Sequence, residues 1–540
     1  MPIAISAKDL CKTFVSHEGE NIHALDGVSL QVAEGEVLGI LGPNGAGKTT
    51  FLNALSTLLI PDVGTIEILG IRSVPKNFNR LRRILNMSSG YPNFPWSLTV
   101  EENLRFYGRL YGYSGRELES RIGKLIEMFE LVPFAKRRFE ELSSGGKQRL
   151  SLAKAMINDP KVIFLDEPTV GLDPDIAVKT REIIKNVLRD FKVTVLLTTH
   201  NMQEAETMCG RIAFIKQGRI IRLATPGELK SVHGKKDLEE VFIHLTKENV
   251  QTQEGLSFPA QPDAEVSPPA PEERMDPWSE CTAWIRRCLA FTYRNVLFAT
   301  RNLFAFMELL FWPMVSLISI GLLGDFLQLH EKALAFVLTG AIAAGVLQVA
   351  QLDVAYSLLY EVWSKSMKHT MLTPVGVFEN IIGSWLVGIM RGSAIFFVLG
   401  VSAIGLFGFK FPAWQVTAVF LTGIFCCALL LGLLVSVLIL LFGQKAEITA
   451  WMFAYIFMLL CGIYYPIDTL PKFFYNVAKF VPVTYFLEYF RASFGFEPTL
   501  TGLLGKGFAL IVVYFILGLS VMRFAFHQAR KKGIIVKLSE

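Results

Sequence analysis

The sequence predicts an α/β domain with a helical insert, followed by an all-α domain of six membrane-spanning helices. Three observations support this two-part fold: a glycine-rich loop between a strand and a helix, long apolar runs that begin near residue 304, and a mean hydropathy of +0.40. Of the 540 residues, 51% are hydrophobic and 42 are Phe, which indicates a membrane protein rather than a large soluble enzyme.

The glycine-rich loop has the Gly-x-x-x-x-Gly-Lys-Thr spacing of a phosphate-binding P-loop, between the apolar run Val37–Leu41 and a helical pattern over residues 49–59. Glycines let backbone N–H groups surround an anion, and the helix directs the positive end of its dipole to the same place. We expect Lys48 to reach the terminal phosphates and Thr49 to hold Mg²⁺. A chance glycine turn is the alternative, which the full spacing disfavours. The predicted nucleotide-binding residues of the loop are Gly42, Pro43, Asn44, Gly45, Ala46, Gly47, Lys48, Thr49 and Thr50.

The α/β P-loop NTPase domain is expected over residues 1–245. Within it, residues 98–139 follow a mostly helical pattern, which predicts the insert. Residues 162–166 and 193–198 are short β-branched runs that suit buried parallel strands.

Two connecting stretches follow the α/β domain. Residues 246–277 are rich in Pro and polar residues and predict a disordered linker. Residues 278–303 predict a connecting helix, because Arg287, Arg294 and Arg301 recur every seven residues and share roughly one face. We expect this amphipathic helix at the inner membrane surface, with an ordinary solvated helix as the alternative.

The membrane domain is expected over residues 304–532. An even number of spans and basic residues such as Lys365, Lys368 and Lys445 in the loops on one side predict that both termini are cytoplasmic. The amino end looks like a first strand and not a signal peptide, so we expect a multi-pass protein of the cell inner (cytoplasmic) membrane. The six predicted spans are 304–326, 333–355, 382–408, 414–442, 448–467 and 504–526.

Charge and cysteine content narrow the function classes. The net charge of +5 is small for this length and the basic residues are dispersed, so a nucleic-acid partner is not expected. The seven Cys show no metal-ligand spacing, which disfavours a metal centre built on cysteine or a disulfide framework.

Further motifs follow the P-loop in a characteristic order. An apolar strand ends in Asp166 and Glu167, which suits one carboxylate for Mg²⁺ and one for an attacking water. The run Leu-Ser-Ser-Gly-Gly-Lys-Gln-Arg from residue 142 precedes that strand, Gly171-Leu172-Asp173 follows it, and His200 ends the next strand. With these motifs, residues 4–235 resemble the nucleotide-binding domain of ABC transporters.

This resemblance implies a head-to-tail pair of domains that close over two ATP molecules. Ser143 and Gly145 of one copy would contact the γ-phosphate held by the other copy. It further implies that Glu167 polarises the hydrolytic water, that Asp166 holds Mg²⁺ through water and that His200 senses the γ-phosphate. Phe14 stands where the family places an adenine-stacking aromatic residue, with an ordinary core Phe as the alternative.

The chain departs from the family pattern in two places. The usual Leu-Ser-Gly-Gly-Gln signature reads Leu-Ser-Ser-Gly-Gly, and the Mg²⁺-contacting glutamine ahead of Leu98 is missing. Its position falls on Ser89 or Gly90, with Ser88, Ser89 or water as candidate substitutes. We expect slower or differently coupled hydrolysis.

The membrane half resembles the exporter class that includes G-type eukaryotic transporters, bacterial polysaccharide exporters and drug exporters. The resemblance implies a homodimer, since two ATP sites need two signature helices. It also implies that residues 356–373 include a coupling helix that docks near residues 91–96, with an unremarkable loop as the alternative. The predicted coupling residues are Tyr91, Trp96, Glu361 and Trp363.

Ionisable residues inside the predicted spans are costly and therefore informative. Glu308 and Arg391 are predicted to pair, with Asp353 as a competing partner of Arg391. The alternative is that these side chains extend to the inner interface.

The function predicted from these features is ATP-driven export or flipping of an amphipathic substrate, with ATP and Mg²⁺ as cofactors and membrane lipid as a partner. Candidate substrates are a lipid-linked glycan, a lipid or a hydrophobic small molecule, and no residue fixes the choice. The alternative is a membrane ATPase that transports nothing and signals to or regulates a partner.

Overall fold

The computed structural model describes residues 2–16, 18–235, 237–247 and 277–539, which form two compact units. The first, the α/β unit, comprises Met1–Arg287, Ser364–Gly376 and Arg530–Glu540. The second, the helical unit, comprises Cys288–Trp363 and Val377–Ala529. The predicted linker over residues 246–277 lies outside the described residues except for its first two positions and its last.

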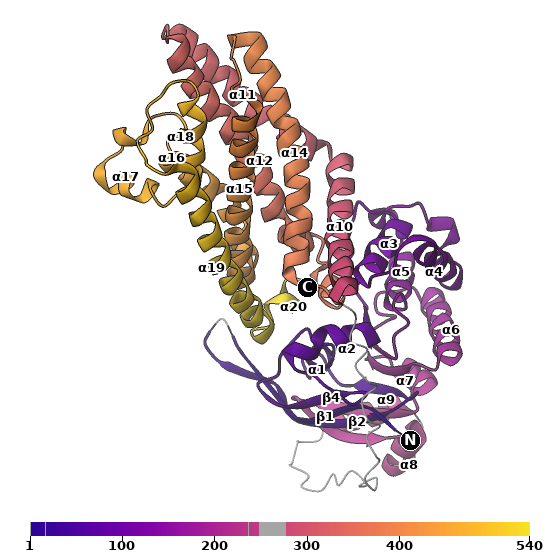
Figure 1. Cartoon of the computed structure of the whole chain (residues 1–540). Helices are drawn as coiled ribbons and strands as arrows, with labels where there is room; N and C mark the ends of the chain where they lie inside the picture. The colour runs from indigo at the N-terminus through magenta and orange to yellow at the C-terminus, as the bar shows by residue number, and fades with distance from the viewer. Residues whose placement is uncertain (1, 17, 236, 248–276, 540) are drawn as a thin grey trace. The chain divides into compact units, whose positions relative to one another are not determined.

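The α/β unit contains two sheets (Figure 1). The antiparallel sheet has the order β2-β1-β4-β5 and consists of β1 (Ile3–Val15), β2 (Asn21–Ala33), β4 (Val63–Ile68) and β5 (Ile71–Arg72). The other sheet has the order β10-β9-β3-β8-β7-β6 and is parallel except for β10. Its strands are β3 (Val37–Leu41), β6 (Leu85–Ser89), β7 (Val162–Asp166), β8 (Thr194–Thr199), β9 (Arg211–Lys216) and β10 (Arg219–Ala224).

The parallel sheet forms because its central strands are apolar on both faces. Every residue of β7 and of β8 is buried, as expected for strands covered by helices on both sides. The register then aligns the carboxyl ends of four neighbouring strands: Leu41 pairs with Thr199, Asp166 with Thr198, and Ser89 with Asp166. Loops that leave these strands therefore start at one edge of the sheet.

Helices surround the sheets of the α/β unit. The predicted insert contains α3 and α4, and a capping box between Thr99 and Glu102 starts α3. The helices are α1 (Lys48–Leu55), α2 (Phe78–Ile84), α3 (Val100–Leu110), α4 (Gly115–Met128), α5 (Ser144–Ala155), α6 (Pro174–Phe191), α7 (Met202–Met208), α8 (Pro226–His233), α9 (Leu238–Lys247), α13 (Met367–Met371) and α20 (Ile534–Lys537).

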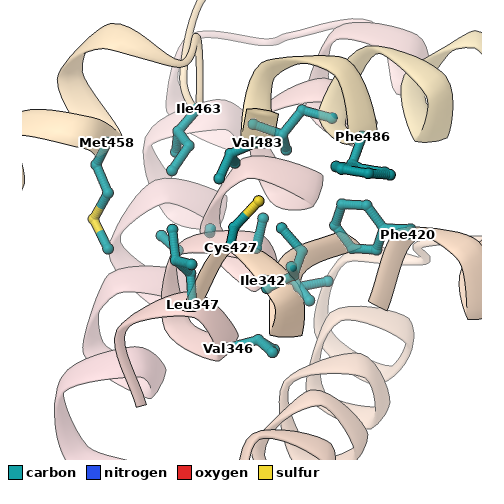
Figure 2. Packing of buried hydrophobic residues seen from close by; sticks show 14 of the residues in the cluster. Ile342, Val346, Leu347, Phe420, Cys427, Met458, Ile463, Val483 and Phe486 are labelled. Atoms are coloured by element: carbon teal, nitrogen blue, oxygen red, sulfur yellow. The ribbon is translucent and has the colours of Figure 1, made fainter. Parts of the chain in front are cut away.

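The helical unit packs long apolar helices around a core contributed by several of them. Figure 2 shows Ile342, Leu347, Cys427 and Phe486 in this core, which excludes water by packing alone. The helices are α10 (Pro277–Arg301), which begins in the α/β unit, α11 (Leu303–Phe326), α12 (Glu331–Trp363), α14 (Val377–Phe407), α15 (Trp414–Phe442), α16 (Thr449–Leu460), α17 (Lys472–Ala478), α18 (Pro482–Ala492) and α19 (Leu503–Lys531).

The fifth predicted span, 448–467, is wrong as a single crossing helix. Among the described residues five helices are long and apolar enough to cross a membrane, and they correspond to the other five predicted spans. In place of the fifth span, a 3₁₀ turn over Gly443–Ala446 precedes the 12-residue α16. Twelve residues rise about 18 Å, less than the hydrocarbon thickness of about 30 Å. The helix ends here because Gly462 turns the chain with a φ of 72°.

Candidate nucleotide-binding site

The P-loop leads from β3 into α1 and can be built only with glycine at two positions. A Cβ atom on Gly42 would lie 2.2 Å from the carbonyl oxygen of Ile215, and one on Gly47, whose φ is 104°, would lie 2.3 Å from that of Ala24. The turn brings backbone N–H groups and the amino end of α1 to one place, which fits a phosphate group. Pro43, Asn44, Gly45 and Ala46 complete the turn, and Thr50 follows on α1.

Lys48 lies between the loop and the carboxylates that follow β7. Its ammonium group donates to the carbonyl oxygens of Gly42 at 2.8 Å and Pro43 at 3.1 Å, and its Nζ lies 3.9 Å from Glu167 Oε1. Burial lowers the pKa of Lys48, whereas the charges of Glu167 and Asp166 raise it. A phosphate bound in the loop would supply the negative charge that a buried ammonium group requires.

Asp166 and Thr49 provide a site that fits Mg²⁺. The Asp166 carboxylate accepts hydrogen bonds at Oδ1 from Thr198 Oγ1 at 2.7 Å and from Thr49 Oγ1 at 3.4 Å. Carboxylate and hydroxyl oxygens are the hard ligands that Mg²⁺ prefers beside phosphate. When bound there, the ion would neutralise charge on the phosphates. The Oδ2 atom of Asp166 lies 3.5 Å from Lys368 Nζ.

Glu167 and His200 meet at the same edge of the sheet. The Nδ1 atom of His200 lies 3.3 Å from Glu167 Oε2, and the imidazole side chain is 55% exposed. The backbone N–H of Glu167 donates to the Thr198 carbonyl oxygen at 3.0 Å, so β8 orients the carboxylate. The geometry brings the predicted base and γ-phosphate sensor together with the P-loop lysine.

The predicted signature residues occupy a different element. Ser143 precedes α5 and its hydroxyl accepts from the Gly146 N–H at 3.3 Å, which caps the helix and leaves Ser143 exposed. Gly145 is buried, and a Cβ there would lie 2.7 Å from Ile176 Cγ2. These residues therefore form an exposed helix amino end beside α3 and α4, while the P-loop starts α1 (Figure 1).

Phe14 lies on β1 and is half-buried. A Cβ on Gly533 would lie 3.0 Å from Phe14 Cε1, which places the ring beside the carboxyl-terminal segment of the same unit. Its adenine-stacking role stays a prediction.

The predicted coupling residues are divided between the two units. Tyr91 is 70% exposed, and the Trp96 carbonyl oxygen accepts from the Glu140 N–H at 3.4 Å. Glu361 and Trp363 belong to the helical unit, where Glu361 pairs with Arg294 and the Trp363 indole N–H donates to Glu447 at 3.4 Å.

The connection between α12 and α14 packs within the α/β unit against Phe94, which lies in the range 91–96 where the coupling helix was expected to dock. The individual side chains that make these contacts were not predicted. In this segment, Ser364–Gly376, the buried His369 ring stacks on Phe94 with ring centroids 4.6 Å apart. The Tyr111 hydroxyl donates to the Leu372 carbonyl oxygen at 3.4 Å. No motif marks these residues; the adjacent basic pair of Lys368 and His369 is the only local signal.

Two ion pairs bury charge in the helical unit. Arg391 pairs with Asp353, the expected competitor of Glu308, while the side chain of Glu308 lies outside the described residues. Arg294 is 3% exposed and pairs with Glu361, so its predicted place on a membrane-surface face of the connecting helix is wrong. A buried guanidinium group requires an opposite charge, and Glu361 supplies it.

Comparison with known proteins matches a family model to each half of the chain. The family model described as ABC transporter matches residues 25–170, and the one described as ABC-2 type transporter matches residues 286–494. Nod factor export ATP-binding protein I of Paraburkholderia xenovorans (strain LB400) is 41% identical over 218 residues, 40% of this chain and 71% of that protein. The daunorubicin/doxorubicin resistance ATP-binding protein DrrA of Streptomyces peucetius is 38% identical over 254 residues, 47% of this chain and 74% of that protein. A solved ATP-binding subunit of an ABC transporter has a TM-score of 0.40 and 30% identity, covering 45% of this chain and all of that one.

Proposed function

The chain belongs to the ABC transporters, and we propose that it uses ATP to export or flip an amphipathic molecule across the cytoplasmic membrane. It is an ATP-binding and ATP-hydrolysing multi-pass membrane protein with an ABC-2 type membrane domain. Similar chains are named for Nod factor export and for daunorubicin/doxorubicin resistance. We therefore place the substrate among lipid-linked glycans, lipids and hydrophobic small molecules.

One observation carries this proposal: the segment between α12 and α14 packs inside the unit that contains the ATP site. His369 and Leu372 of this segment contact Phe94 and Tyr111, which belong to the α/β unit by sequence. The two helices that flank the segment are both long and apolar enough to cross a membrane. A rearrangement at the ATP site is thereby transmitted through covalent connections to both helices.

The proposed working form is a homodimer with both termini in the cytoplasm. The even span count no longer supports this orientation, but the membership of Arg530–Glu540 in the same compact unit as the amino end does. The P-loop, Glu167 and His200 meet within one protomer, while Ser143 presents an exposed helix amino end on another element. A head-to-tail pair would bring this amino end to the phosphates of the other protomer, as the family resemblance implies. In that arrangement Glu167 would accept a proton from the attacking water, Lys48 would hold the phosphates, and Thr49 and Asp166 would hold Mg²⁺.

The proposal is tested by ATP-dependent uptake into inverted membrane vesicles, combined with lipid and metabolite profiling of the producing cells. Wild type is compared with Glu167→Gln, and Glu117→Gln, at an exposed position of α4, serves as the matched control. Export predicts that one amphipathic compound accumulates in wild-type and Glu117→Gln vesicles and not in Glu167→Gln vesicles. Identical profiles in all three strains would contradict export and favour a regulatory membrane ATPase.

A further inference from the structure

Asp166 has a third partner that its position beside the P-loop does not explain. Its Oδ1 atom accepts from two hydroxyl groups of the α/β core, whereas its Oδ2 atom faces the ammonium group of Lys368 at 3.5 Å. Both side chains are nearly buried, at 10% exposure for Lys368 and 9% for Asp166. Screening by water is weak at such a site, so the interaction between these charges is substantial.

The loop after β6 offers no side chain at Gly90 for the role of the missing glutamine. A Cβ on Gly90 would lie 2.3 Å from the Glu167 carbonyl oxygen and 2.5 Å from Val170 Cγ1, so this position accepts only glycine. Ser88 is also occupied, because its hydroxyl shares a hydrogen bond with Ser151 Oγ at 2.9 Å. Ser89 ends β6 within the α/β unit, and the contact between the metal-binding carboxylate and a membrane-connected segment comes from Lys368.

Lys368 is held in place by the residues around it. Its backbone N–H donates to the Ser539 hydroxyl at 2.9 Å, and the neighbouring His369 is 2% exposed and stacked on Phe94. These contacts all lie within the α/β unit. The segment that carries Lys368 is therefore folded and buried, which holds the ammonium group near Asp166.

We propose that the Lys368 ammonium group and Mg²⁺ compete for the carboxylate of Asp166, so that Lys368 leaves this carboxylate when ATP binds with its metal. Lys368 would thus respond to bound metal in place of the missing glutamine. Because Lys368 belongs to the segment between α12 and α14, metal binding would act on this segment directly. The inference deepens the proposed function and rests on it, since it assigns the coupling residue of the same ATP site. Two cations that share one buried carboxylate repel each other, and this repulsion is the basis of the competition.

Direct counting of bound Mn²⁺ by electron paramagnetic resonance tests the competition without measuring turnover. Full-length protein in lipid nanodiscs carries Glu167→Gln to prevent hydrolysis, and Mn²⁺ is titrated in the presence of excess ATP. We expect Lys368→Met to lower the Mn²⁺ concentration for half-saturation about tenfold. Lys365→Met removes an exposed charge from the same segment and should leave the half-saturation unchanged.

Equal Mn²⁺ concentrations for half-saturation in Lys368→Met and Lys365→Met would overturn the inference. ATP binding in EDTA reports whether the variant retains a folded P-loop. If Lys368→Met loses this binding, Lys368→Gln is measured in the same way and decides the question. Because the readout is metal binding, failure of the protein to export any compound would leave this result intact, and failure of the competition would leave export intact.

Discussion

The Arg294 ion pair of the helical unit and the ATP site of the α/β unit hold charged groups in different ways. In the helical unit, Arg294 pairs with Glu361 and also donates to Asn295 and Asn380, so that each charge lies in a closed polar cluster. In the α/β unit, Glu167 lies 3.3 Å from His200 and 3.9 Å from Lys48. Short, closed contacts suit a charge that stabilises a helix bundle, whereas longer contacts suit a charge that changes partners during a reaction.

Neutralising Glu167 should have the largest effect on the ATP site. Glu167→Gln should lower ATP hydrolysis about 10²–10⁴-fold, because the attacking water loses its general base. Binding of ATP should persist, since Lys48 and the loop amides remain. Steady-state ATPase and equilibrium nucleotide binding of the purified protein measure both properties. Hydrolysis at the wild-type rate would show that Glu167 is not the base.

Substitutions in the Arg294–Glu361 pair of the helical unit should change the stability of the protein and not the chemistry of ATP hydrolysis. Glu361→Gln leaves Arg294 buried beside a neutral partner and should cost about 3–5 kcal/mol of unfolding free energy. The double variant Arg294→Met with Glu361→Gln should recover much of this loss, because no uncompensated charge remains. Denaturant titration in detergent compares the three proteins. A single variant as stable as wild type would contradict a closed ion pair.

A substitution at Gly90 tests how the backbone beside Glu167 affects the ATP site. Gly90→Gln places a glutamine at one of the two candidate positions of the family pattern, but its Cβ would displace the Glu167 backbone. We therefore expect about tenfold slower hydrolysis and a loss of about 1–3 kcal/mol in stability. Ser89→Gln places the glutamine at the other candidate position, where a Cβ is already present, and should leave stability unchanged. The two ATPase rates and unfolding midpoints test this prediction. Faster hydrolysis in Gly90→Gln would show that the loop tolerates a side chain.

The pH dependence of stability should show the smallest effect. Burial, together with the nearby charge of Lys368, lowers the pKa of Lys154 to about 7. Between this pKa and the unfolded value of 10.5 the unfolded chain binds more protons, so stability should rise as pH increases from about 7 to 9. Lys154→Met should flatten this part of the pH profile of the melting temperature. An unchanged slope would mean that Lys154 is charged in the folded state.

The sequence predicted that Asp166, Glu167 and His200 lie near the P-loop because they end or follow strands of one parallel sheet, whereas the signature residues begin a helix. Asp166, Glu167 and His200 meet for that reason alone, as the strand register shows. The contact between Lys368 and Asp166 joins residues about two hundred positions apart through a segment without a motif, so no local pattern could reveal it. Membrane spans were predictable from apolar length, but the broken fifth span depends on a turn at Gly462 that hydropathy does not measure.

The central claim is that each ATP site is shared between two protomers, and mixing two inactive variants tests it most directly. Lys48→Ala disables the P-loop, and Ser143→Arg disables the exposed amino end of α5. Each variant alone should hydrolyse no ATP, whereas co-reconstituted protein should recover about a quarter of wild-type activity, since half of random dimers carry one intact site of two. A mixture as inactive as its components would contradict a shared site.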